Sequence, residues 1–205
     1  MTRPLTRSYH HGDLPGVLRA TTAELIAERG AVGFSLREVA RRAGVSHAAP
    51  THHFGDSTGL LTSVATEAYR LLCEAFSPLA EIGDPVERLR RLGEIYVAFA
   101  EENPGHFALM CNKDQVDVLN EDFVHWAAAS YIALLDTLDQ IRQHSNPNLD
   151  VELAATMLWS TAHGLATVSR NLEDVAANTD TTTAPPKELI RKFVDLVMTG
   201  LAERP

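Results

Sequence analysis

The sequence predicts an all-α protein, and three observations support that fold class. Apolar residues recur at the three- and four-residue spacing of a helix face in one segment after another. Residues typical of helix starts and ends, such as Ser, Asp, Pro and Gly, stand between these segments. No segment shows the alternating pattern of a strand and no internal repeat is found, so we expect only helices and loops.

The first predicted helix begins near Leu14 and should stop at Gly30. Its apolar residues are spaced so that they share one face, and they are Leu14, Val17, Leu18, Thr21 and Leu25. A glycine directly after such a stripe is typical of a helix C-terminus, because glycine readily adopts the backbone conformation needed there.

Two short helices are predicted next, joined at a glycine. Ser35 stands three residues before Glu38, which is the spacing of a capping box, and the helix that it starts should end just before Gly44. Ser46 is then predicted to cap the third helix. Pro50 lies inside that helix, so its ring should press on the carbonyl of Ser46 and distort the helix start.

The remaining predicted helices follow from Asp56 onward. Asp56 is expected to cap a long helix that runs through residue 76, and the pairs Asp84-Pro85 and Asn103-Pro104 open the next two helices. Another long helix covers residues 123–141. Two apolar stripes predict the last two helices, namely Leu158, Thr161, Leu165, Val168 and Leu172, then Leu189, Phe193, Leu196, Val197 and Gly200.

Charge divides the chain after Gly55. Residues 1–55 carry seven Arg against four Asp and Glu, a balance of +3, and five of the nine histidines. Residues 56–205 carry eleven Lys and Arg against twenty-three Asp and Glu, a balance of -12. This asymmetry indicates a polyanionic partner at one end only, so we expect two domains, 1–55 and 56–205.

Two short helices that meet across a glycine are typical of a helix-turn-helix, which places its second helix in the major groove of DNA. Exposed side chains of that helix can read base edges, and cationic side chains nearby can hold phosphates. The candidate base readers are His47, Ala48, Thr51 and His52. The candidate phosphate ligands are Arg37, Arg41 and Arg42, and the predicted DNA-binding set is completed by Ser35, Ser46 and His53.

Several segments resemble the TetR family of one-component transcriptional regulators. They are SYHHGDL, AELIAERG, FSLREVARRAGVS and HHF in the first part of the chain, and WSTAHG, with Trp159, His163 and Gly164, far downstream. The last segment resembles a subgroup whose C-terminal effector domain carries W-x-x-x-H-G.

The resemblance implies a homodimer whose first three helices bind a palindromic operator in double-stranded DNA. It also implies a C-terminal pocket for a small-molecule effector and a dimer interface, which we expect on the last two helices as an isologous four-helix bundle. Regulators of this kind typically repress transcription and are released by their ligand.

Two positions depart from the pattern of the TetR family. Thr51 stands where members commonly carry Tyr, and Ser57 stands where they carry Lys, and both of those residues contribute to contacts with the DNA backbone. Their loss should weaken the attraction to phosphates, which His52 and His53 would partly restore. The alternative function is therefore a dimeric helical interaction protein with weakened DNA binding.

Aromatic and soft side chains of the C-terminal part are candidates for lining the ligand pocket, although most such residues in helical proteins belong to the core. Trp159 and His163 are four residues apart and share one helix face, where they could flank a ligand. The candidates are Tyr96, Phe99, Phe107, Met110, Trp126, Tyr131, Trp159 and His163.

Other functional classes find little support in the sequence. It contains no nucleophile elbow, phosphate-binding loop or regular His/Cys spacing, and Cys73 and Cys111 stand alone, so we expect no catalytic site, metal site or cofactor. The N-terminus lacks the apolar core of a secretory signal, and the longest uncharged run, residues 153–169, is too polar to span a bilayer. We therefore expect a cytoplasmic protein without a membrane partner.

Overall fold

The computed structural model describes residues 13–31, 34–110, 112, 114–179 and 184–202, with the backbone alone for 169–179 and 201–202. These residues form nine α-helices and a 3-10 helix, with no strand among them, which confirms the predicted all-α class. The helices are α1 Leu14–Arg29, α2 Leu36–Ala43, α3 Ala49–Phe54, α4 Ser57–Phe76, η1 Ser77–Glu81, α5 Pro85–Glu102, α6 Pro104–Met110, α7 Glu121–His144, α8 Val151–Thr179 and α9 Pro186–Ala202.

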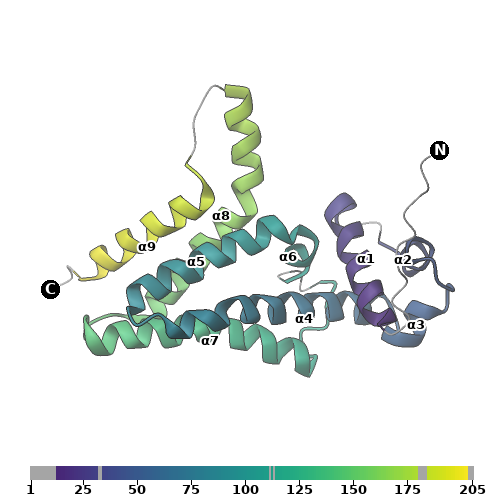
Figure 1. Ribbon diagram of the computed structural model, residues 1–205, viewed down its shortest axis with the longest axis horizontal. Helices are drawn as coiled ribbons and strands as arrows, with labels where there is room; N and C mark the ends of the chain where they lie inside the picture. Colours follow the sequence, from purple (N-terminus) through teal and green to yellow (C-terminus); the bar gives the residue numbers. More distant parts are fainter. Residues whose placement is uncertain (1–12, 32–33, 111, 113, 180–183, 203–205) are drawn as a thin grey trace.

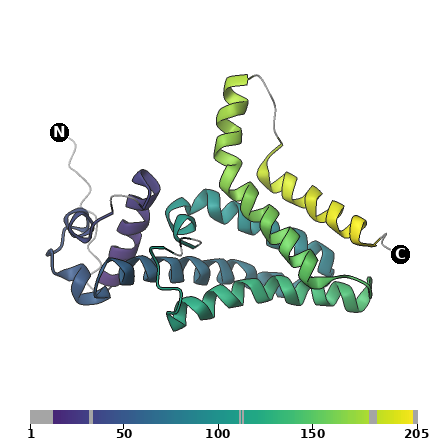
Figure 2. The same ribbon diagram turned by 180° about the vertical axis from the view of Figure 1, so that it is seen from behind.

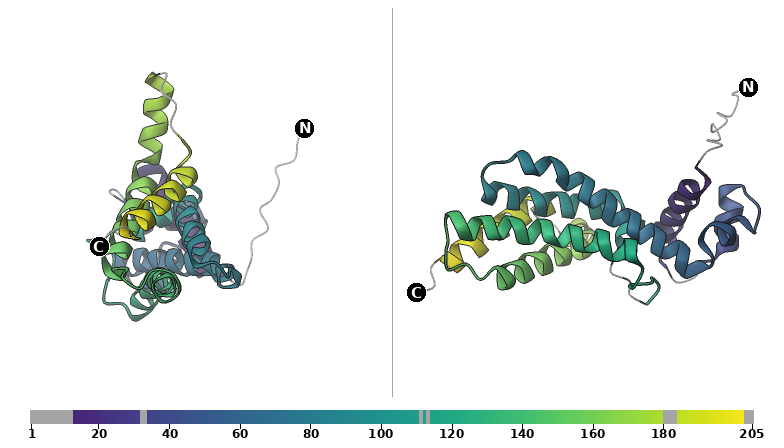
Figure 3. Two further views of the ribbon diagram at one scale, coloured as in Figure 1. Left: turned by 90° about the vertical axis from the view of Figure 1, so that its left-hand side faces the viewer. Right: turned by 90° about the horizontal axis from the view of Figure 1, so that it is seen from below.

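The molecule is elongated, with α1, α2 and α3 gathered at one end (Figure 1). The long helix α4 leads from this end into a body formed by α5, α7, α8 and α9, and α7 lies along α4 in the view from behind (Figure 2). The last part of α8 projects away from the body, whereas α9 returns to pack on α5 (Figure 3). No described helix is both long enough and apolar enough to cross a membrane.

Local signals account for most helix ends. The side chains of Ser35, Asp56 and Asp84 accept backbone N–H groups of the first helical turn at 3.3, 2.8 and 2.9 Å, as predicted for N-caps. Gly44 ends α2 in the left-handed conformation, at φ 71° and ψ 30°, and Gly30 ends α1 at φ 71°. Each of these N-cap hydrogen bonds joins residues two or three positions apart, so the sequence alone is sufficient to predict it.

The start of α3 corrects the prediction. The helix begins at Ala49 and its N-cap position is Ala48, so the hydroxyl of Ser46 does not cap it. The carbonyl of Ser46 instead accepts the N–H of Ala49 at 3.0 Å, which forms a turn before the helix. Pro50 consequently lies in the first turn of α3, where a missing N–H costs nothing, and the predicted clash with Ser46 does not arise.

Most residues of the predicted apolar stripes are buried, with a few exceptions. Leu18 and Leu25 of α1, and Leu158 of α8, belong to the core. In contrast, Val17, Val168 and Leu196 are 40%, 40% and 68% exposed in the single chain. The side chain of Leu172 lies outside the described residues, as do Cys111 and residues 8–12 of the SYHHGDL segment.

Each end of the molecule has a core of its own, formed by a cluster of buried side chains. At the first end, Leu18, Val39, Leu60, Val64 and Leu109 from α1, α2, α4 and α6 are fully buried in one cluster. In the body, a second cluster joins α5, α7, α8 and α9, and includes Leu89, Leu138, Leu158 and Val194. Helix α4 contributes to the first cluster and continues into the body, so one continuous helix belongs to both ends of the molecule.

Candidate DNA interface and ligand cavity

The outer face of α3 is open to solvent. Val39 and Ala40 anchor α2 in the core, and Pro50 is the buried residue of α3, so α3 packs through its inner side. Thr51, His52 and His53 are exposed on α3. His47 and Ala48 are also exposed, but they lie in the turn before α3, because the helix starts later than predicted. The arrangement therefore leaves an outward surface formed by the turn and by the outer side of α3.

The three arginines proposed for phosphate contacts differ in their surroundings. Arg41 pairs with Glu38 through two hydrogen bonds of 2.8 Å, and Arg42 pairs with Glu28 of α1 at 2.7 and 2.8 Å. Arg37 is exposed and has no charged partner among the described residues. Arg37 is thus the arginine most available to a phosphate.

The arginines of these two ion pairs lower the pKa of the carboxyl groups to which they are hydrogen-bonded. Hydrogen bonding from Arg41 lowers the pKa of Glu38 to about 2, and hydrogen bonding from Arg42 lowers the pKa of Glu28. Because Glu38 is committed to Arg41, the structure shows only half of the capping box, in which Ser35 accepts the N–H of Glu38. Ser35 itself is exposed, as are Ser46 and Ser57.

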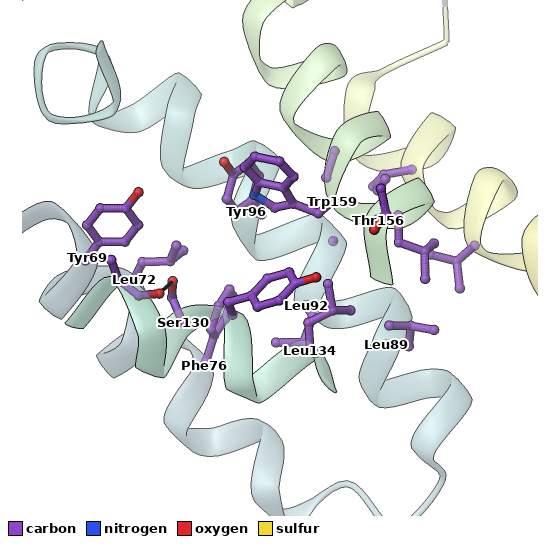
Figure 4. Close-up of a pocket in the computed structure, with 17 residues that line it drawn as sticks. Tyr69, Leu72, Phe76, Leu89, Leu92, Tyr96, Ser130, Leu134, Thr156 and Trp159 are labelled. Carbon is purple, nitrogen blue, oxygen red and sulfur yellow. Dashed lines mark hydrogen bonds between the residues drawn. The ribbon is translucent and has the colours of Figure 1, made fainter. Parts of the chain in front are cut away.

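A cavity of about 400 Å³ lies in the body. Helices α4, α5, α7, α8 and α9 enclose it, with Phe76 and Leu134 across from Tyr96 and Trp159 (Figure 4). Its lining consists of Tyr69, Leu72, Phe76, Leu89, Leu92, Gly93, Tyr96, Ala127, Ser130, Tyr131, Leu134, Thr156, Leu158, Trp159, Ala162, Ile190 and Val194. The volume falls within the range of about 300–1,000 Å³ that is typical of small-molecule sites.

Three of the eight predicted pocket residues line this cavity, namely Tyr96, Tyr131 and Trp159. The other five do not, and they are Phe99, Phe107, Met110, Trp126 and His163. Phe99 of α5 and Met110 of α6 are buried in the same core cluster as Tyr96, and the carbonyl of Trp126 accepts a hydrogen bond from the Cys73 thiol on α4. An aromatic residue on a body helix therefore does not by itself mark the cavity wall.

His163 lies directly behind the cavity wall and positions two of its aromatic residues. Its Nδ1 shares a hydrogen bond of 3.1 Å with the hydroxyl of Tyr96, and its ring stacks on Trp159 with 5.8 Å between centroids. Phe107 of α6 packs on the imidazole at 5.4 Å. Burial lowers the pKa of His163, so the ring is neutral at neutral pH.

Sequence reasoning missed most of the apolar wall. Leu72, Leu89, Leu92 and Leu134 carry the same helical periodicity as any core leucine, and no local signal separates a cavity wall from a packed interface. Tyr69 was also missed, and its hydroxyl donates to the carbonyl of Met110 at 2.9 Å.

Helix α6 connects the cavity wall with the first three helices. Phe107 contacts His163 and Tyr96 on one side, with 5.8 Å between the Phe107 and Tyr96 ring centroids. Gly105, two residues earlier, lies so close to α1 that an added Cβ would be 1.8 Å from the carbonyl oxygen of Ala23. Helix α6 therefore contacts the cavity wall on one side and packs closely against α1 on the other.

An ion-pair cluster reinforces this contact between helices. Glu67 of α4 lies 3.0 Å from the Nε of Arg19 on α1 and 3.5 Å from the Nε2 of His106 on α6. Burial alone would raise the pKa of Glu67, but the hydrogen bonds and charges of His106 and Arg19 lower it below its usual value. Glu67 thus ties α1, α4 and α6 together.

The described residues contain no group of three or more His, Cys, Asp or Glu side chains that could hold a metal ion. Cys73 is half-buried, and burial raises the pKa of its thiol. A thiol in such surroundings is a weak nucleophile.

Comparison with protein families gives two matches. Residues 18–64 match the bacterial regulatory proteins of the tetR family, and residues 89–196 match the tetracyclin repressor-like C-terminal domain. No curated protein matches the sequence significantly.

Several solved structures share the fold over nearly the whole chain. A protein of unknown function from Rhodococcus sp. RHA1 is 29% identical, with 97% of this chain and 100% of that chain covered and a TM-score of 0.76. The TetR family transcriptional regulator PfmR from Thermus thermophilus is 25% identical, with 92% and 99% covered and a TM-score of 0.71. The fatty acid degradation regulator FadR from Bacillus halodurans is 17% identical, with 97% and 100% covered and a TM-score of 0.75.

Proposed function

Since the chain belongs to the TetR family of bacterial regulatory proteins and is a DNA-binding regulator, we propose that it is a homodimeric repressor. It binds a palindromic operator through residues 1–55, and a small molecule bound within residues 56–205 releases it. The observation that carries this proposal is the exposed outer face of α3 beside an uncommitted Arg37, on the positively charged end of an acidic chain.

The charge distribution supports an orientation on DNA. The balance of +3 over residues 1–55 attracts phosphates, and the balance of -12 over residues 56–205 repels them, so α3 is directed toward the duplex. Thr51 and His52 then reach base edges, while Arg37 holds the backbone. Arg41 and Arg42 contribute if a phosphate displaces or joins their carboxylate partners.

Exposed apolar side chains on α8 and α9 support the proposed dimer. Met157 and Val168 of α8 are 39% and 40% exposed, and Leu196 of α9 is 68% exposed. Paired with the same helices of a second copy, these side chains would be removed from water in a four-helix bundle. The twofold axis would place two α3 helices on half-sites one helical turn apart, or a multiple of it.

The cavity and α6 support the proposed release by a ligand. A molecule that displaces Trp159 or Tyr96 also displaces His163 and Phe107, and Gly105 leaves α6 no space to move without moving α1. The distance between the two DNA-binding ends of the dimer would change, and the operator would no longer fit both ends. A regulator of transcription acts where the chromosome is, so we propose a cytoplasmic location, and we propose no catalytic activity.

Selection of bound fragments from a DNA library at two salt concentrations tests the DNA-binding part of the proposal. We expect a palindromic sequence and an affinity that falls steeply with salt, because phosphate contacts release counterions. Arg37→Ala should weaken binding to all sequences, and Arg142→Ala, which removes the same charge from the exposed surface of α7, is the matched control. Binding without sequence selection and without salt dependence would contradict the proposal.

A second candidate function is a dimeric helical interaction protein with weakened DNA binding. The pairing of Arg41 and Arg42 with carboxylates, and the exposure of Thr51 and Ser57 where the family pattern has Tyr and Lys, favour it. The double variant Thr51→Tyr, Ser57→Lys separates the two candidates. A large gain in operator affinity supports the second candidate, whereas a small gain supports the repressor.

A further inference from the structure

We propose that the cavity binds a neutral, predominantly apolar molecule whose hydroxyl or carbonyl oxygen lies at the cavity rim. This inference rests on the proposed function, in which the cavity receives the ligand that releases DNA. It specifies the chemical class of that ligand, and it excludes carboxylates, phosphates and ammonium ions as the buried part.

The wall of the cavity carries no charged side chain. None of the seventeen lining residues is Asp, Glu, Lys, Arg or His. Charged side chains of α5 and α9 are paired with one another instead, as in Arg191 with Glu94 at 2.7 Å and Arg90 with Asp195 at 2.7 Å. An ionic group inside the cavity would lose its hydration without gaining a counter-ion, which is strongly unfavourable.

The floor and the rim of the cavity differ in their exposure to solvent. The floor is apolar and closed, since Leu72, Leu89, Ile190 and Val194 are each between 1% and 2% exposed. The rim is accessible, since Tyr131 is 37% and Trp159 is 44% exposed, and Thr156 is also exposed. A ligand therefore enters with its apolar end first and keeps its polar end near the rim.

The polar groups of the wall and of the rim differ in their hydrogen bonding. At the wall, Tyr69 donates to Met110, Ser130 donates to Ala127 at 2.8 Å, and Tyr96 shares its hydrogen bond with His163. At the rim, the hydroxyls of Tyr131 and Thr156 and the indole N–H of Trp159 have no hydrogen-bond partner among the described residues.

These three rim groups are all able to donate. Neutral Tyr and Thr hydroxyls can donate one hydrogen bond each, and an indole N–H can only donate. They therefore match an acceptor on the ligand, such as a carbonyl or hydroxyl oxygen.

The volume limits the size of the ligand. A cavity of about 400 Å³ holds roughly 13 water molecules at about 30 Å³ each. The apolar part of the ligand is therefore a chain of roughly ten carbon atoms, or a ring system of similar volume.

Displacement of the neutral fluorescent probe N-phenyl-1-naphthylamine from the full-length protein tests the inference. The competitors are 1-decanol, sodium decanoate and decyltrimethylammonium at pH 8, where decanoate is ionised. We expect 1-decanol to displace the probe at a concentration at least tenfold lower than either ion.

A variant distinguishes binding of the competitors in the cavity from their nonspecific association with the protein. Thr156→Arg places a cation at the rim without removing a buried side chain, and it should improve displacement by decanoate about tenfold relative to 1-decanol. Ser160→Arg, on the same helix and exposed but not lining the cavity, is the matched control and should leave both competitors unchanged. Thermal unfolding of both variants verifies that they are folded.

The outcomes are distinct for the ligand class and for the regulator. Equal displacement by decanoate and 1-decanol, or the same response in both arginine variants, overturns the inference. If neither the probe nor any of the three competitors binds, this inference is overturned, and so is the proposal that a ligand in the cavity releases the protein from DNA. The DNA selection described above uses the protein without ligand, so failure of the DNA-binding proposal would appear there alone.

Discussion

The close approach of α6 to α1 leads to a sharp prediction for Gly105→Ala. The added Cβ would lie 1.8 Å from the carbonyl oxygen of Ala23 and 2.6 Å from its carbonyl carbon, and both are backbone atoms that no rotamer change can move. Real Cβ contacts are not shorter than 3.0 Å, so α6 must retreat from α1 by at least the difference, about 1.2 Å.

The expected cost follows from overpacking a closed interface. Strain of this kind destabilises proteins by about 1–3 kcal/mol, and for a chain of this length the midpoint of thermal unfolding falls by about 2–4 °C per kcal/mol. We expect Gly105→Ala to lower the midpoint by roughly 2–12 °C in a calorimetric or circular dichroism scan. Operator affinity should fall as well, because α1 shifts with α6.

Gly83→Ala is the matched control for this experiment. Gly83 lies in the loop before α5, outside the left-handed φ region, and a Cβ there would meet no heavy atom within 4 Å. Replacing a glycine by alanine where the backbone conformation suits both gains about 0.4–1 kcal/mol, so the midpoint should stay or rise. A Gly105→Ala protein as stable as Gly83→Ala would refute the tight contact between α6 and α1.

Three further predictions concern the DNA-binding end and the cavity wall. Arg37→Ala should reduce the salt dependence of operator binding by about one charge per contact, whereas Arg42→Ala should also lower stability because it breaks the pair with Glu28, which urea unfolding would measure. Changes at Thr51 should alter the DNA sequence that is selected from a library, and should leave the salt dependence of binding unchanged. An altered salt dependence with an unchanged selected sequence would mean that Thr51 contacts phosphates rather than bases. Burial lowers the pKa of His163, so the unfolded chain binds a proton at this residue more readily than the folded chain does. The contribution of His163 to the free energy of unfolding is therefore fully present above about pH 6.5 and decreases as the pH falls below that value. His163→Gln should remove this pH-dependent contribution, which urea unfolding at pH 7.5 and 5.5 would measure.

Helix starts illustrate what could and could not be predicted. Asp56 and Asp84 were identified correctly because a capping side chain bonds to a backbone N–H two or three residues away, which is a local interaction. Ser46 was assigned wrongly as the cap of α3, although it has a suitable side chain. Helix α3 packs against α2 and α4 and follows a turn at residues 46–49, and contacts between helices are not local in sequence.

The cavity illustrates the same limit more strongly. Tyr96 and Phe99 are three residues apart on α5 and are both buried, yet only Tyr96 borders the cavity. The helical period places both residues on the inner side of α5, but their neighbours come from α4, α6 and α8. Whether a neighbour touches a side chain or leaves space beside it depends on how those helices cross.

By itself, the sequence determined the all-α class, most helix ends, the glycine turn between α2 and α3, and the separation of positive from negative charge. These properties follow from spacing, capping and composition, which act over a few residues or over the whole chain. Only the tertiary structure decided which arginine stays uncommitted, where α3 begins, and which side chains border a cavity rather than a packed core. Those properties depend on contacts between helices that are distant in sequence, and close packing makes them sensitive to every neighbour.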